Sequence, residues 1–182
     1  MVEDRLTRLN FRLANQSDIT KIASLHARNW KVGYRGMCPD EYLDHRVDEE
    51  RLSVWKSRFQ VPNKNQHIVV AEDEAGVFAG FVCTYLNFHK KWGAYLDNLH
   101  VAPEYQGLGM GQRLMQKAAE WVKENESSST LYLHVLKENH GAIRFYERIG
   151  GKFIGEVEVD LPWGGKGMVY DYLWELHQLI PA

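Results

Sequence analysis

The stretch Gln106-Gly107-Leu108-Gly109-Met110-Gly111 determines how this chain is interpreted. A strand-like run ends just before it at Val101, and a helix-like run follows it. The apolar positions of that run recur at helical spacing, at Gly111, Leu114, Met115, Ala118 and Val122. Alternating glycines allow positive φ angles and turn several N–H groups toward one point, where the start of a helix adds partial positive charge. The stretch therefore predicts a phosphate or pyrophosphate site.

Two other glycine-loop classes do not match this stretch. The dinucleotide pattern G-x-G-x-x-G has no glycine at its last position, whether it starts at Gly107 or at Gly109. A nucleoside triphosphate loop needs Gly-Lys-Ser/Thr, but Gln112 and Arg113 follow Gly111. In isolation, three glycines are as typical of a plain turn as of a ligand site, so the flanking segments must decide.

The flanking segments resemble a known family. The pattern Q-x-x-G-x-G after residues 99–105 resembles the acetyl-CoA loop of the GNAT superfamily of N-acetyltransferases. A second block resembles the next strand and helix of that family, with Tyr132-Leu133-His134-Val135 followed by Asn139, Ala142, Phe145-Tyr146 and Gly150. Together the two blocks cover residues 95–153, and two motifs in the family's order are more specific than either alone.

Composition predicts one globular domain over residues 1–182, because the chain is 45% hydrophobic and 25% charged. A net charge of -2, with no long basic run, argues against nucleic acid. Residues 1–5 are acidic where a signal peptide would be basic, and no apolar run suits a membrane, so we expect a cytoplasmic protein. Cys38 and Cys83 have no metal-like spacing and are expected to be free thiols, with no metal bound.

The pattern of apolar residues and breakers predicts an α/β (α+β) chain. The resemblance implies a single GNAT-like domain with a central mixed, mostly antiparallel sheet of about seven strands flanked by about four helices, in which splayed strands form the acetyl-CoA cleft. Strands are expected over residues 10–13, 67–72, 77–87, 92–101, 130–135, 153–160 and 168–174. Helices are expected over residues 17–30, from about 48 to 60, from about 112, and over 139–149.

The resemblance also implies the cofactor contacts. The backbone of the strand before the loop would bind the arm of acetyl-CoA, and the loop amides would bind the pyrophosphate at glycines whose missing side chains leave room for it. The side chains of Leu99 and Val101 are expected to be ordinary buried ones. Asn139 is equally consistent with a helix cap and with a bond to the pantetheine arm. The implied cofactor residues are Leu99, His100, Val101, Gln106, Gly107, Leu108, Gly109, Met110, Gly111, Gln112, Asn139 and Tyr146.

Two residues are candidates for proton transfer. Tyr146 matches a family tyrosine that protonates the departing thiolate, although without the motif it would be interpreted as a core aromatic. Asp97 is the candidate base, because strand alternation places it on the face of Leu99 and Val101. A structural ion pair is an alternative for Asp97, His134 and Glu156 are weaker candidates, and a water chain could replace a single base.

The acceptor site is predicted from the segments outside the motifs. Trp30, Tyr34 and Trp163 are candidates for its wall, although each is also an ordinary packing residue. An acidic run over residues 40–50 could attract a cationic amine, but a solvated helical face is the simpler interpretation.

The predicted activity is transfer of an acetyl group from acetyl-CoA to a primary amine by direct attack in a ternary complex. The acceptor is a small-molecule amine or an amino group of a peptide or protein. Neither motif contains a cysteine, which disfavours a covalent acetyl-enzyme. The alternative is an acetyl-CoA sensor without turnover. A homodimer in which the terminal strands pair is compatible with the sequence.

Overall fold

The computed structural model describes residues 9–181 except residues 62, 126 and 128. Residues 1–5, on which the expectation about a signal peptide depends, lie outside this part. Among the described residues, no helix is both long enough and apolar enough to cross a membrane.

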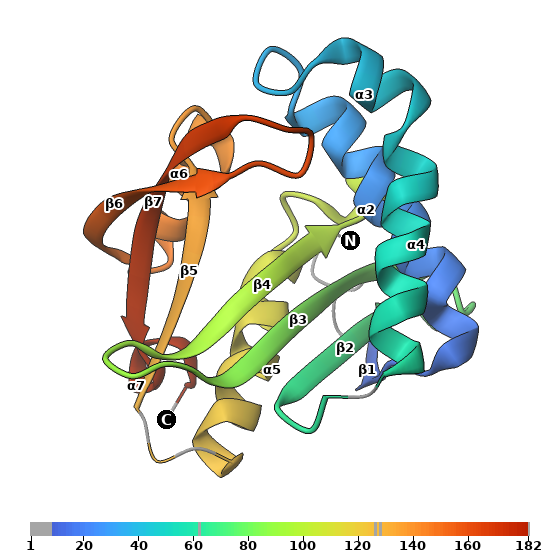
Figure 1. Cartoon of the computed structure of the whole chain (residues 1–182). Coiled ribbons are helices and arrows are strands. Elements are labelled where there is room, and N and C mark those ends of the chain that lie inside the picture. Colours follow the sequence, from blue (N-terminus) through green and yellow to red (C-terminus); the bar gives the residue numbers. More distant parts are fainter. Residues whose placement is uncertain (1–8, 62, 126, 128, 182) are drawn as a thin grey trace.

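The seven strands form one sheet, in the order β1-β2-β3-β4-β5-β7-β6 (Figure 1). All neighbouring strands pair antiparallel except β4 and β5, which pair in parallel. The expected mixed, mostly antiparallel sheet is therefore confirmed. The strands are β1 (Asn10–Leu13), β2 (Gln66–Glu72), β3 (Phe78–His89), β4 (Gly93–Val101), β5 (Thr130–Leu136), β6 (Lys152–Asp160) and β7 (Lys166–Glu175).

The α-helices of the described part are α2 (Ile19–Gly33), α3 (Asp40–His45), α4 (Val47–Gln60), α5 (Met110–Asn125), α6 (His140–Arg148) and α7 (Leu176–Leu179). The four longer helices match the four expected ones. The short α3 and α7 were not expected. Acidic residues in the first turn of α3 and a capping box at α7 explain why these short segments are helical.

The sheet lies between two groups of helices. On one face of β3, the Phe81 ring packs edge-on against Trp55 of α4, with centroids 5.2 Å apart. On the other face, a Cβ atom added to Gly80 would lie only 3.1 Å from Leu114 of α5. Figure 1 shows α5 passing behind β3 and β4. Strand alternation therefore directs one set of β3 residues to α4 and the other to α5.

Strands β4 and β5 are joined over only a short length. The paired residues are Ala94 with Leu131 and Tyr95 with Tyr132. Beyond these pairs the two strands diverge toward the upper part of Figure 1. The second half of β4 is therefore paired with β3 on one side only.

A β-bulge interrupts β4 at Asp97. Cys83 of β3 lies opposite Asn98, and the next β3 residue lies opposite Leu96, so Asp97 has no residue opposite it. A bulge breaks strand alternation. As a result Asp97 and Asn98 both contact Arg58 of α4. The expectation that Asp97 shares the face of Leu99 and Val101 is therefore wrong.

Candidate active site

Two cavities lie on either side of the diverging strands. The loop cavity, of about 700 Å³, is bounded by the end of β4, the glycine loop and α6. The helix cavity, of about 500 Å³, is bounded by α2, α4, β4 and β5. Both are lined by Asn29, Leu99, Asn139, Ala142 and Tyr146. The two cavities therefore meet at these residues.

The glycine loop presents backbone N–H groups to the loop cavity. Gly107 and Gly109 have φ angles of 74° and 84°, which favour glycine. The amide of Arg113 bonds to the carbonyl of Gly109 at 3.2 Å, as the first turn of α5 closes. The amides of residues 110–112 therefore have no carbonyl one turn earlier in the helix to bond. This arrangement matches the predicted anion site.

Gly111 has a different role from the one expected. A Cβ atom there would lie 2.9 Å from the Phe145 ring of α6. Gly111 thus lets α5 and α6 approach closely. Its missing side chain leaves room for the Phe145 ring and not for a pyrophosphate.

The peptide groups of Leu99 and Val101 point away from β3. The amide of Ala102 bonds to the carbonyl of Ala79 at 2.8 Å, and hydrogen-bonded pairs alternate along an antiparallel ladder. In the register of β3 and β4, this alternation leaves Leu99 and Val101 outside the hydrogen-bonded pairs. Their N–H groups therefore face the gap between β4 and β5.

The Val101 carbonyl is already engaged. It accepts hydrogen bonds from the side-chain amides of Asn29, at 3.0 Å, and Gln106, at 3.1 Å. Gln106 thus fixes the start of the loop to the end of β4 through its side chain.

Most of the predicted cofactor residues line the loop cavity. Two do not: Leu108 lies outside its lining, and His100 lines the helix cavity. The reason for His100 is alternation, because it lies opposite Phe81 and so faces α2. Sequence reasoning missed Arg148, an exposed cation at the end of α6 that lines the loop cavity. The predicted residues that line it are Leu99, Val101, Gln106, Gly107, Gly109, Met110, Gly111, Gln112, Asn139 and Tyr146.

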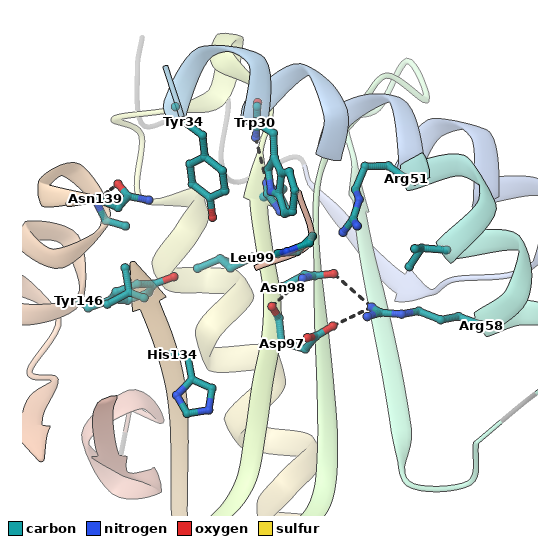
Figure 2. Close-up of a pocket in the computed structure, with 17 residues that line it drawn as sticks. Trp30, Tyr34, Arg51, Arg58, Asp97, Asn98, Leu99, His134, Asn139 and Tyr146 are labelled. Carbon is teal, nitrogen blue, oxygen red and sulfur yellow. Dashed lines mark hydrogen bonds and ion pairs between the residues drawn. The ribbon is translucent and has the colours of Figure 1, made fainter. Parts of the chain in front are cut away.

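Asn139 is compatible with both of its expected roles. Its Oδ1 accepts a hydrogen bond from the amide of Ala142 at 3.2 Å and so caps α6. Its amide nitrogen points in the opposite direction, toward Tyr34 (Figure 2). The cap therefore leaves the donor side of Asn139 available.

The Tyr146 hydroxyl lies where the two cavities meet. In Figure 2 it points toward Leu99. The ring is held by Phe145 and Trp174, with centroid distances of 5.3 and 5.7 Å. Burial, and to a lesser degree the neighbouring Tyr34, raise the pKa of Tyr146 above its usual value. The phenol therefore keeps its proton and can donate it.

The helix cavity contains two candidate bases. Asp97 Oδ2 lies 2.7 Å from an Arg58 nitrogen, so the alternative of an ion pair is realised. His134 Nδ1 lies 2.5 Å from Oδ1 of Asp171, the residue of β7 that lies directly opposite it. Glu156 pairs with Lys137 and is not part of the lining.

The aromatic candidates come together at the top of the helix cavity. Trp30 and Tyr34 line it, and burial raises the pKa of Tyr34 to about 12. Trp163, from the turn between β6 and β7, packs against Trp30 and Tyr34, with centroid distances of 5.8 and 5.9 Å. Trp163 itself covers this pair, whereas its neighbour Pro162 lines the cavity.

The two cysteines are expected from the sequence to be free thiols, with no metal ion bound. Cys38 and Cys83 are both free and buried. Within the described ranges, no group of three or more His, Cys, Asp or Glu side chains is placed to hold a metal ion.

Comparison with known families identifies the architecture. Residues 26–151 match the model of the acetyltransferase (GNAT) family. The uncharacterized N-acetyltransferase YuaI of Bacillus subtilis is 28% identical over 80% of this chain and 81% of the relative. The spermine/spermidine N(1)-acetyltransferase of the same species is 31% identical over 44% of this chain and 51% of the relative.

A solved structure shows the same fold. The spermidine N-acetyltransferase of Vibrio cholerae, in complex with CoA and spermine, superposes with a TM-score of 0.68. It is 20% identical to this chain, and the match covers 95% of this chain and 98% of that structure.

Proposed function

The chain belongs to the GNAT family of acetyltransferases, and on that premise we propose that it transfers an acetyl group from acetyl-CoA directly to the primary amine of a small molecule. The observation that carries this proposal is the meeting of the two cavities at Leu99 and Tyr146. A cofactor in one cavity and an acceptor in the other would place their reacting groups between these two residues.

The loop cavity fits acetyl-CoA. Its backbone amides at residues 110–112 suit a pyrophosphate, and Arg148 adds a cation for phosphate oxygens. The N–H of Leu99 points into the gap where a thioester carbonyl would lie and can stabilise negative charge on its oxygen. Acetyl-CoA would supply the activated acetyl group. Residues of this chain would bind it, donate a proton to the thiolate and accept a proton from the amine.

Tyr146 is the proposed acid. As the amine nitrogen bonds to the acetyl carbon and the carbon–sulfur bond breaks, the sulfur leaves as a thiolate that needs a proton. The Tyr146 hydroxyl points toward this place and keeps its proton. A buried Cys83, whose thiol pKa is raised by burial, is a poor nucleophile, which favours direct transfer over a covalent acetyl-enzyme.

His134 is the proposed base. Asp171 holds its Nδ1, so Nε2 remains to take the proton that the amine loses. Asp171 would also stabilise the imidazolium that forms. Asp97, the candidate from the sequence, remains the alternative, although Arg58 already occupies its Oδ2.

The shape of the helix cavity favours a small acceptor over a protein. Its volume of about 500 Å³ lies in the usual range for small ligands, and the aromatic cluster of Trp30, Tyr34 and Trp163 closes its top. A location in the cytoplasm and a homodimer in which the terminal strands pair stay predictions from the sequence. Of these strands, β6 lies at an edge of the sheet.

The direct test is CoA thiol release from acetyl-CoA over a panel of amino acids, diamines, polyamines, amino sugars and short peptides. We expect turnover with small amines, and a peptide preference would contradict the proposed acceptor class. Tight acetyl-CoA binding in calorimetry without turnover on any amine would favour the sensor alternative.

A further inference from the structure

The helix cavity contains two arginines that the mechanism does not use. Arg51 and Arg58 stand seven residues apart on α4, so they share one face of the helix. Their side chains are 8% and 24% exposed. Figure 2 shows both projecting from α4 into the space beside Asn98 and Leu99. Two partly desolvated cations thus border the place where the acceptor would lie.

Both guanidinium groups keep N–H donors free. All hydrogen bonds and ion pairs of Arg58 use Nη1, with Asp97 Oδ2 at 2.7 Å and Asn98 Oδ1 at 3.2 Å. Its Nε and Nη2 have no hydrogen-bond partner among the residues described. Arg51 uses Nε and Nη2 on Glu50, which leaves Nη1 without a partner in the described part.

The neighbouring carboxylates, in contrast, are all paired. Asp97 is the one acidic side chain in the described lining of the helix cavity, and Arg58 holds it. Behind the lining, Glu50 is paired with Arg51 and Asp171 with His134. The acidic residues of α3 are also neutralised in part, because Arg35 pairs with Asp40 and Asp44. A second ammonium group on the acceptor would find, among the described residues of the lining, only a carboxylate that already shares its charge with an arginine.

His100 adds no positive charge to this surface, but it adds a hydrogen-bond donor. Burial, together with the nearby charge of Arg51, lowers its pKa to about 3, so it is neutral at ordinary pH. Its Nδ1 lies 3.4 Å from the side-chain nitrogen of Asn29, which identifies Nδ1 as the acceptor and Nε2 as the N–H donor. His100 Nε2 therefore joins Arg51 and Arg58 as an N–H donor on this side of the cavity.

We infer that the acceptor is an amino acid, whose amine is acetylated while its carboxylate binds Arg51 and Arg58. Guanidinium groups bind carboxylates with paired, charge-assisted hydrogen bonds, and a desolvated cavity strengthens such bonds. This inference rests on the proposed function and narrows its substrate class. It separates this chain from an enzyme for polyamines, which carry several ammonium groups and no carboxylate.

Matched acceptors test the inference. L-lysine differs from cadaverine, and L-ornithine from putrescine, only by the carboxylate. We expect kcat/KM to be at least about tenfold higher for each amino acid than for its diamine, because the carboxylate makes hydrogen bonds to charged groups. Spermidine should be a poor acceptor. Equal or better turnover of the diamines would overturn the inference.

A double variant tests the residues. Arg58→Gln combined with Asp97→Asn removes the cation without leaving a carboxylate unpaired. Any effect of the double variant on catalysis itself applies equally to L-lysine and to cadaverine, so it cancels in the comparison. The KM of L-lysine should rise at least about tenfold and the KM of cadaverine should change little. The control is Arg28→Gln with Glu104→Gln, which removes an exposed arginine–glutamate pair at 2.9 Å. Arg51→Lys should also raise the KM of L-lysine, because lysine lacks the bidentate fork.

The outcomes separate the two proposals. Turnover of diamines without turnover of amino acids would overturn the inference and leave the acetyltransferase proposal intact. No turnover of any amine would overturn both. An unchanged ratio of KM values in both the double variant and Arg51→Lys, with circular dichroism showing folded proteins, would remove the arginines from acceptor binding.

Discussion

The loop cavity offers an anion mainly backbone groups, whereas the helix cavity offers side chains. The first presents the amides of one continuous loop and one strand end, within residues 99–112, and side chains of α6, among them Arg148, complete its wall. The second uses side chains from α2, α4, β4 and β5, which are far apart in the sequence. A backbone site tolerates many side chains but needs particular φ angles. A side-chain site can change its ligand by single substitutions, so the proposed function assigns the choice of acceptor to this half of the molecule.

The largest expected effect is at the place where the two cavities meet. Tyr146→Phe should lower kcat about 100-fold, because the thiolate loses its acid, while the Kd of acetyl-CoA changes less than about twofold. Steady-state kinetics and calorimetry measure the two quantities. The control is Tyr172→Phe, which removes a hydroxyl bonded to Glu147 outside both cavities. An unchanged kcat at saturating substrates would remove Tyr146 from the mechanism.

The next effect separates the two bases of the helix cavity. His134→Gln should lower kcat/KM about tenfold at neutral pH, since water can replace part of the function of a base. Asp97→Asn should lower kcat/KM less than about twofold. The reverse pattern would assign the base to Asp97.

A backbone change should affect only the loop cavity. Gly109→Val should raise the Kd of acetyl-CoA about tenfold, because a left-handed conformation costs an ordinary L-residue roughly 1–2 kcal/mol. Gly76→Val, at a φ of 76° in the turn between β2 and β3, is the matched control for backbone strain. If both variants bind acetyl-CoA equally well, the loop does not act through its conformation.

A side-chain change should affect only the helix cavity. Trp163→Ala removes the ring contacts with Trp30, Tyr34 and Tyr42. It should raise the acceptor KM about 3- to 10-fold, with the KM of acetyl-CoA unchanged. The control is Trp92→Ala, in the turn between β3 and β4. A rise in the KM of acetyl-CoA instead would mean that the hairpin closes the loop cavity.

Acid should weaken the helix-cavity side first. Burial lowers the pKa of His26 well below its usual value and that of His100 to about 3. The unfolded chain binds protons below about pH 6.5, so the stability that the neutral rings provide is complete above that value and is lost as the pH falls toward 3. Hydrogen exchange at pH 5 should show faster opening of α2 and α4 and little change in α6. Helix α5 is no control, because its Trp121 stacks on His67, whose pKa burial lowers to about 4. Equal acceleration in α2, α4 and α6 would contradict this.

The same comparison explains what the sequence could predict. The positions along the chain of the seven strands, the four longer helices and the glycine loop follow from local patterns, because turns, periodicity and loop glycines act within short segments. The bulge at Asp97 carries no glycine or proline signal, so its face was predicted wrongly. The pairing of His134 with Asp171 depends on the register of β5 and β7, which lie more than 30 residues apart. The position of Arg51 and Arg58 in the cavity could have been predicted from one feature of the sequence. Their spacing of seven residues places both side chains on one face of α4.

On the proposed function, the short ladder between β4 and β5 links the stability of the protein to the supply of acetyl-CoA. Only two residue pairs join these strands, and each cavity has walls on both sides of the divergence. A ligand that spans the divergence binds the folded chain and not the unfolded one, so at 100 times its Kd it adds about 2.7 kcal/mol to the free energy of unfolding. The abundance of this protein in a cell should then rise and fall with its acetyl donor, since unfolded copies are the ones that proteases remove.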